Sequence, residues 1–91
     1  MNLKIASIPC DLSQGMFDNE YAVELTVSGG KVVSFFADKC LVKTNGTTAH
    51  GLIKVGVAGE VAGQSKILLP SEAFESGSRW VEVPRGQLQP T

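Results

Sequence analysis

The alternation of apolar and polar residues in segment 20–38 is the feature that most constrains the fold of this chain. In its first half, polar or small residues separate the apolar positions Tyr21, Val23, Leu25 and Val27. A period of two predicts a strand with one buried face. After Gly29 and Gly30, segment 31–37 is rich in β-branched and aromatic residues, which is typical of a second strand. The two runs therefore predict a β-hairpin.

The register of this hairpin follows from which residues would face each other. A two-residue loop at Gly29 and Gly30 sets Leu25 opposite Ser34, which mixes apolar and polar residues on one face. A three-residue loop over 28–30 instead sets Val23 opposite Phe35, Leu25 opposite Val33 and Glu24 opposite Ser34. Cross-strand pairing and the separation of the two faces favour the three-residue loop.

A second hairpin is predicted around Asn45 and Gly46, because this dipeptide readily adopts the positive φ angles of a type I′ turn. The incoming strand covers 40–44 and the outgoing strand 47–58, with Thr44 opposite Thr47. The outgoing strand has Ile53, Val55 and Val57 on its apolar face. As an alternative, residues 38–44 form one helical turn that begins at Asp38.

Glycines and prolines divide the rest of the chain. Gly56, Gly59 and Gly63 indicate bends or bulges in two strands that meet near residues 62–64, and such bends allow a small sheet to curl. Ser71 is a suitable N-cap, so at most one short helical turn is expected near 71–76. A last strand covers 80–83, and the tail 85–91 is expected to fray.

These elements predict the fold class. A chain of 91 residues with 43% hydrophobic residues has the size and apolar content of one domain over residues 1–91. Short strands punctuated by glycine predict an all-β protein: a small curled sheet or barrel of five to seven short antiparallel strands. A Src-homology-3-like barrel or a similar small barrel fits this description.

Charge and terminal sequence argue against several partners and locations. Eight basic and nine acidic residues give a net charge of −1, and the basic residues are scattered, so nucleic-acid binding is not expected. Lys4 and the short apolar run that follows do not make a signal peptide, and no apolar segment has membrane-spanning length. We therefore expect a cytoplasmic protein without a membrane partner, in which Cys10 and Cys40 are free thiols.

No residue pattern indicates catalysis, a metal or a cofactor. His50, the one histidine, has no recognisable nucleophile and acid at a typical spacing. Cys10, Cys40 and His50 lack the close ligand pairs of zinc sites. The Ser-x-x-Lys string at Ser28 lies in a predicted hairpin turn rather than at a helix start. We therefore expect a protein that is not an enzyme and that needs no metal and no cofactor.

Other motif matches have structural explanations. The glycines at 56, 59 and 63 lack the Gly-Lys-Ser/Thr of a phosphate loop and are better explained by sheet curvature. Asn45 begins a glycosylation sequon, but the turn explains it without a secretory signal. Glu72, Glu75 and Glu82 could flank a pocket, although a solvated surface explains them more simply.

Several apolar residues lie at positions that the alternation assigns to the outward face of the sheet, and these residues are informative about function. If Val33 and Phe35 face the core, then Val32 and Phe36 face outward. In the last strand, if Val81 and Val83 face the core, then Trp80 shares the outer face with Glu82. Two alternatives explain such residues: a cover formed by the loop 10–19, with Met16 and Phe17, or an interaction site. The candidate binding residues are Val32, Phe36, Trp80 and Glu82.

The sequence therefore favours a non-catalytic binding or assembly module that acts through protein-protein contact, including self-association as a homo-oligomer. A binder of small molecules or of single-stranded nucleic acid, using aromatic residues on a curled sheet, is the alternative.

Overall fold

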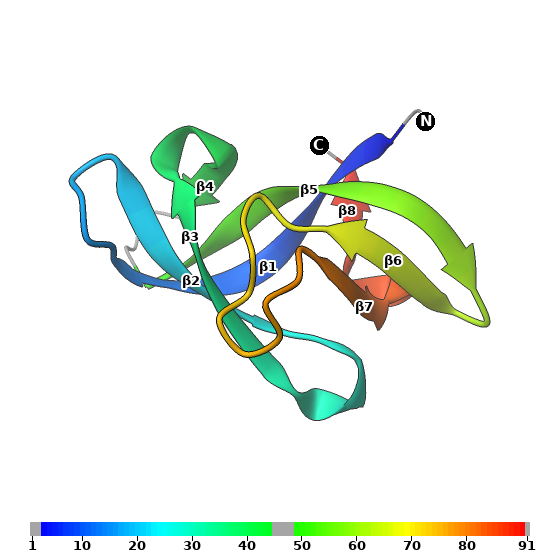
Figure 1. Cartoon of the computed structure of the whole chain (residues 1–91). Helices are drawn as coiled ribbons and strands as arrows, with labels where there is room; N and C mark the ends of the chain where they lie inside the picture. The colour runs from blue at the N-terminus through cyan, green and yellow to red at the C-terminus, as the bar shows by residue number, and fades with distance from the viewer. Residues whose placement is uncertain (1–2, 45–48, 91) are drawn as a thin grey trace.

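A computed structural model describes residues 3–44 and 49–90 as one antiparallel sheet that curls into a half-barrel (Figure 1). The strands are β1 (Lys4–Gln14), β2 (Glu20–Thr26), β3 (Val32–Asp38), β4 (Val42–Thr44), β5 (His50–Val61), β6 (Gln64–Leu68), β7 (Trp80–Pro84) and β8 (Gln89–Pro90). Three 3-10 turns separate some of them: η1 (Ser28–Gly30), η2 (Lys39–Leu41) and η3 (Arg85–Gln87).

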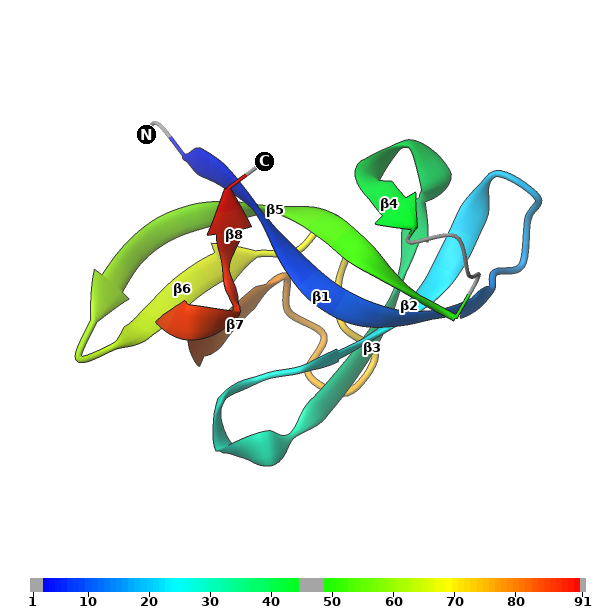
Figure 2. The same cartoon turned by 180° about the vertical axis from the view of Figure 1, so that it is seen from behind.

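The strand order is β3-β2-β1-β5-β6-β7, and β4 and β8 pair with β5 and β1 respectively. The all-β, curled antiparallel fold is as predicted from the sequence. The sheet has eight strands, however, and not five to seven. The difference arises because the segment before residue 15 and the tail after residue 85 each contribute a strand, as the view from behind shows for β8 beside β1 (Figure 2).

The first hairpin has the predicted register. Val23 lies opposite Phe35, Glu24 opposite Ser34 and Leu25 opposite Val33. The loop is closed by a hydrogen bond of 2.8 Å from the Val27 N–H to the Lys31 carbonyl. Its two glycines have φ angles of 86° and 76°, a region that side chains with a Cβ rarely adopt. Local chemistry thus fixes this hairpin.

The β5–β6 hairpin also forms where the glycines predicted it. Ala62 and Gly63, with φ angles of 53° and 79°, form the tight connection. The register between β5 and β6 shifts between Val57 and Gly59, which marks a bulge. This irregularity lies in β5, the long curved strand along the top of the view in Figure 1.

Strand β1 is the main element that the sequence analysis missed. The predicted cover loop 10–19 is wrong, because residues up to Gln14 belong to a strand that pairs with β5 along most of its length. Pro9 lies between the part of β1 that pairs with β8 and the part that pairs with β2. A proline is tolerated there because its missing N–H removes no hydrogen bond to those strands.

The second hairpin differs from the prediction in its register. Thr44 lies opposite Gly51 and not opposite Thr47, which is outside the described residues. A Cβ at Gly51 would lie 2.7 Å from the Lys43 carbonyl oxygen, so this close pairing requires glycine. The alternative turn at Asp38 is present in shortened form: its carboxylate accepts a hydrogen bond of 3.1 Å from the Cys40 N–H at the start of η2.

The tail and the role of Ser71 also differ from expectation. Residues 85–90 form η3 and β8 rather than fraying, because Leu88 packs against the core and the Gln87 side-chain amide donates to the Thr26 carbonyl. As expected, no more than one turn forms near 71–76: the Gly77 N–H donates to the Ala73 carbonyl over 2.8 Å, and the Ala73 N–H donates to the Ser78 carbonyl over 3.0 Å. Ser71 does not cap a helix, since its hydroxyl donates to the Phe36 carbonyl instead.

The buried apolar side chains form one cluster inside the curl. They come from alternate positions of β1, β2, β3, β5, β6 and β7, with Phe35 fully buried among them, and from Val27, Leu69 and Ala73 outside the strands. The complete set is Ile8, Cys10, Leu12, Val23, Leu25, Val27, Val33, Phe35, Ala37, Ile53, Val55, Ile67, Leu69, Ala73 and Val83. The opposite positions of the same strands therefore face outward and are available for function.

Candidate binding groove at the β7 edge

Strand β7 lies at one end of the sheet order, so one of its edges has no strand beside it in the described part of the chain. The residues that flank β7 show which of its backbone groups face β6. Before β7 the Arg79 carbonyl accepts from the Leu69 N–H, and after β7 the Arg85 N–H donates to the Gly63 carbonyl. The alternation of an antiparallel ladder then directs the backbone groups of even-numbered residues away from β6.

Among these even-numbered residues, Glu82 is the one with a free donor and acceptor. The Trp80 N–H donates to Ser78 Oγ over 3.0 Å, so a local side chain already satisfies it. Pro84 has no N–H to offer. Glu82 lies opposite Lys66, and its N–H and carbonyl point to the open edge.

The Trp80 side chain borders an open groove of about 350 Å³ beside this edge. Trp80 is 38% exposed as a residue, and the Lys66 Nζ lies 5.2 Å from the centroid of its ring. This cation–π contact covers one face of the ring. The groove is lined by Val27, Ser28, Lys66, Trp80, Val81 and Glu82. Residues of β6, β7 and the β2–β3 turn thus meet at one hollow; from here on it is called the Trp80 groove.

Strand β3, at the other end of the sheet order, is covered by the β6–β7 connection. The Ser34 N–H and hydroxyl donate to the Glu75 carboxylate over 2.7 and 2.8 Å, and the Phe74 N–H donates to the Ser34 carbonyl. These bonds from Ser34 lower the pKa of Glu75 below its ordinary value. The Phe36 ring meets the Phe74 ring edge-on, with 5.3 Å between centroids.

The structure thus separates the four candidate binding residues into two groups. Trp80 and Glu82 line the Trp80 groove. Phe36 is half-buried against Phe74, and Val32 is 47% exposed at the start of β3.

The proposed cover from residues 10–19 is absent, since Met16 and Phe17 are themselves 74% and 66% exposed. Sequence reasoning missed Val27, Ser28 and Lys66. The cross-strand pairing of Lys66 with Glu82 would have been the signal for the lysine.

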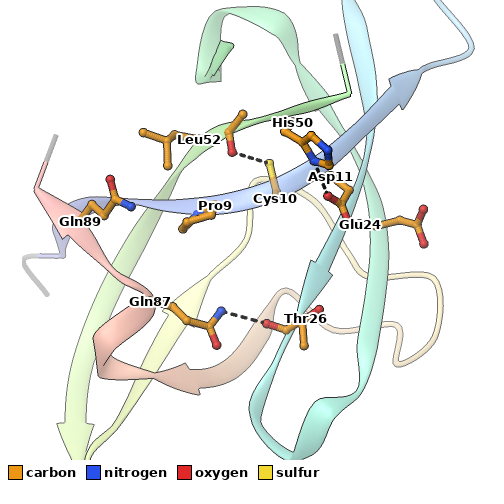
Figure 3. Close-up of a pocket in the computed structure, with 10 residues that line it drawn as sticks. Pro9, Cys10, Asp11, Glu24, Thr26, His50, Leu52, Gln87 and Gln89 are labelled. Atoms are coloured by element: carbon orange, nitrogen blue, oxygen red, sulfur yellow. Dashed lines mark hydrogen bonds and ion pairs between the residues drawn. The ribbon is translucent and has the colours of Figure 1, made fainter. Parts of the chain in front are cut away.

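The one histidine lies in a different groove, on the outer face of β1 and β5 (Figure 3). His50 Nδ1 is 2.8 Å from Asp11 Oδ1, and both side chains are exposed. The neighbouring Cys10 thiol points toward the Gly51 carbonyl at 3.6 Å. Burial, with a smaller contribution from Asp11, raises the pKa of Cys10 to about 11. This thiol is therefore protonated at neutral pH and is not a nucleophile for the His50–Asp11 pair.

The remaining candidates are dispersed. Cys40 is exposed and unbridged, and a hydrogen bond with Asp38 is the main cause that raises its pKa. Glu75 is bound to Ser34, whereas Glu82 borders the Trp80 groove. Across residues 3–44 and 49–90, no three His, Cys, Asp or Glu side chains are placed to hold a metal ion together.

Comparison of the chain with protein-family models, with curated proteins and with solved structures returned no significant match. None of the helical turns in the described segments is long and apolar enough to cross a membrane.

Proposed function

We propose that this protein is a non-catalytic binding module that takes up an extended segment of a partner protein along β7. The observation that carries the proposal is the exposed Trp80 indole beside a strand edge on which the Glu82 N–H and carbonyl point outward. Strand addition at an open sheet edge is a common mode of peptide recognition, in which main-chain hydrogen bonds give affinity and side-chain pockets give specificity.

The backbone part of the site is short. The Trp80 N–H is satisfied by Ser78 and Pro84 has no N–H, so the bound segment would pair mainly with Glu82. Such a limited edge protects the free protein from indiscriminate strand pairing. It also requires that side chains in the groove supply a large share of the binding energy.

The side-chain part of the site supplies that contribution. The groove volume of about 350 Å³ suits one large apolar side chain against the indole face and Val81. Lys66 and Glu82 place one positive and one negative charge at its border. A segment with an apolar anchor flanked by an acidic and a basic residue would match both charges.

A phage-displayed library of random peptides, selected on the wild-type protein, tests this proposal. We expect selected peptides to share an apolar anchor and to lose about tenfold or more in affinity on Glu82→Pro, measured by isothermal titration calorimetry. The backbone N–H that this change removes faces away from β6, and proline is tolerated on strand edges. Glu82→Ala is the matched control for the side chain, and Phe17→Ala is the control for an exposed aromatic residue elsewhere.

Binding unchanged in both Glu82→Pro and Trp80→Ala would refute the site, as would a selection that yields no specific peptide. The Lys66–Trp80 pair also favours the alternative function, because an aromatic face beside a cation can stack a base and contact a phosphate. Quenching of Trp80 fluorescence by a short oligothymidylate, with no peptide selected, would support that alternative. Net charge −1 and Glu82 beside the indole weigh against it.

A further inference from the structure

A second surface lies on the outer side of β1, β2, β4 and β5, and we propose that two copies of this chain associate through it. The surface is defined by Pro9, Asp11, Glu24, Lys43, Leu52 and Lys54 and is called the β1–β5 face. None of these residues lines the Trp80 groove. Self-association and uptake of an extended segment are therefore independent properties of the molecule.

The β1–β5 face has two hollows that share Leu52. One, of about 410 Å³, contains Asp11 and Glu24 in its lining together with Pro9, as Figure 3 shows. The other, of about 490 Å³, contains Lys43 and Lys54. Leu52 is half-buried and lines both. A projecting apolar side chain between two hollows is a suitable centre for an interface.

The two hollows carry opposite charge. The lining of the first includes two carboxylates and neither lysine nor arginine, while the lining of the second includes two lysines and no carboxylate. Strand pairing fixes this separation. Glu24 of β2 and His50 of β5 lie on either side of Asp11, while Lys43 of β4 lies beside Leu52 of β5. The acidic end and the basic end therefore lie on opposite sides of Leu52.

The strands also place two like charges directly opposite each other. Asp11 faces Glu24 across the β1–β2 pair, an arrangement that is unfavourable in an isolated sheet. The ion pair that His50 forms is with the Asp11 carboxylate and not with Glu24. Lysines from outside the chain would relieve this repulsion.

A second copy supplies these lysines by symmetry. A two-fold axis that lies in the face near Leu52 places the acidic end of each chain on the basic end of the other. The two Leu52 side chains then meet beside the axis. A standard interface of about 800 Å² per partner is about one seventh of the 5632 Å² surface of this chain, which one face can provide.

Charge exchange tests the proposal by sedimentation velocity over a concentration series. We expect the wild type to form a dimer that weakens as the salt concentration rises. The acidic variant Lys43→Glu/Lys54→Glu and the basic variant Asp11→Lys/Glu24→Lys should each lose dimer affinity about tenfold or more, because their faces repel themselves. An equimolar mixture of the two variants should restore a dimer.

Lys4→Glu/Lys31→Glu is the matched control, since it makes the same charge change at exposed lysines outside the face and should leave dimerisation unchanged. Far-ultraviolet circular dichroism checks the fold of each variant. Isotope-filtered nuclear Overhauser contacts between the Leu52 methyl groups of two wild-type chains give a readout that needs no variant.

A wild type that stays monomeric at millimolar concentration and low salt overturns the proposal. It is equally overturned by an acidic variant that dimerises like the wild type, or by variants whose mixture stays monomeric.

Discussion

The substitution Trp80→Ala connects the stability of the sheet with the proposed site. In the structure about three fifths of the Trp80 surface is covered, by its neighbours on β6 and β7 and by Lys66. Because the indole borders an open groove, its removal lets solvent in and leaves no closed cavity. The cost is therefore set by lost contact area and not by a void.

The magnitude follows from that area. A tryptophan that buried its whole side chain would cover about 250 Å², so three fifths corresponds to about 150 Å². An alanine would still cover about 50 Å², which leaves a loss of about 100 Å² and about 2.5 kcal/mol of unfolding free energy. The lost cation–π contact with Lys66 adds about 0.5 kcal/mol. For comparison, Phe35→Ala in the centre of the core should cost about 3–5 kcal/mol.

Urea denaturation followed by far-ultraviolet circular dichroism measures this loss, because the variant has no tryptophan fluorescence. With a slope near 1 kcal/mol per molar urea, the midpoint should fall by about 2.5–3 M. A loss below about 1 kcal/mol would show that the indole does not pack on β6 as described, and a loss above about 4 kcal/mol would show that it belongs to the closed core. The first result would contradict the described packing of Trp80 on β6, and the second would remove the exposed indole on which the proposed site depends.

Two further predictions concern titratable groups. Cys40 should react with a thiol reagent in the folded protein, while Cys10 should react only after unfolding. The reason is that burial protects Cys10 and raises its pKa to about 11. Equal rates for both thiols in the folded protein would contradict this prediction. The pKa of Glu75 is lower in the folded state than in the unfolded state, because Ser34 donates hydrogen bonds to its carboxylate. These bonds therefore stabilise the fold at pH values above the pKa of the unfolded state. The stabilisation is lost as the pH falls through the pKa of the folded state. Thermal melts between neutral and acidic pH should therefore show a steeper loss for the wild type than for Glu75→Gln, and parallel curves would refute the role of this carboxylate.

Local patterns predicted the β2–β3 hairpin because the separation of apolar and polar faces favours the three-residue loop 28–30 over a two-residue loop, and this register is the one observed. Strand β1 was missed although Ile8, Cys10 and Leu12 alternate in its buried positions. A proline is uncommon inside a central strand, and only the arrangement of β2 and β8 along β1 shows why Pro9 fits there. That arrangement is a long-range property that no local pattern contains.

The candidate site was predicted in part for the same reason. Alternation within β7 places Trp80 and Glu82 on the outer side without any knowledge of neighbouring strands. Lys66 and Ser28 join them only through the β6–β7 register and the curl of the sheet, which brings η1 to β7. Phe36 was assigned to the same exposed surface, but the loop after β6 packs Phe74 against it.

Hydrogen exchange at the Glu82 amide tests the central claim most directly. In the free protein this N–H faces the open edge of β7, so it should exchange much faster than the neighbouring Val81 and Val83 amides, which face β6. Addition of a selected peptide should slow exchange at Glu82 by about tenfold or more, because the bound strand accepts its hydrogen bond. A peptide that binds while Glu82 continues to exchange at its free rate would contradict strand addition at β7.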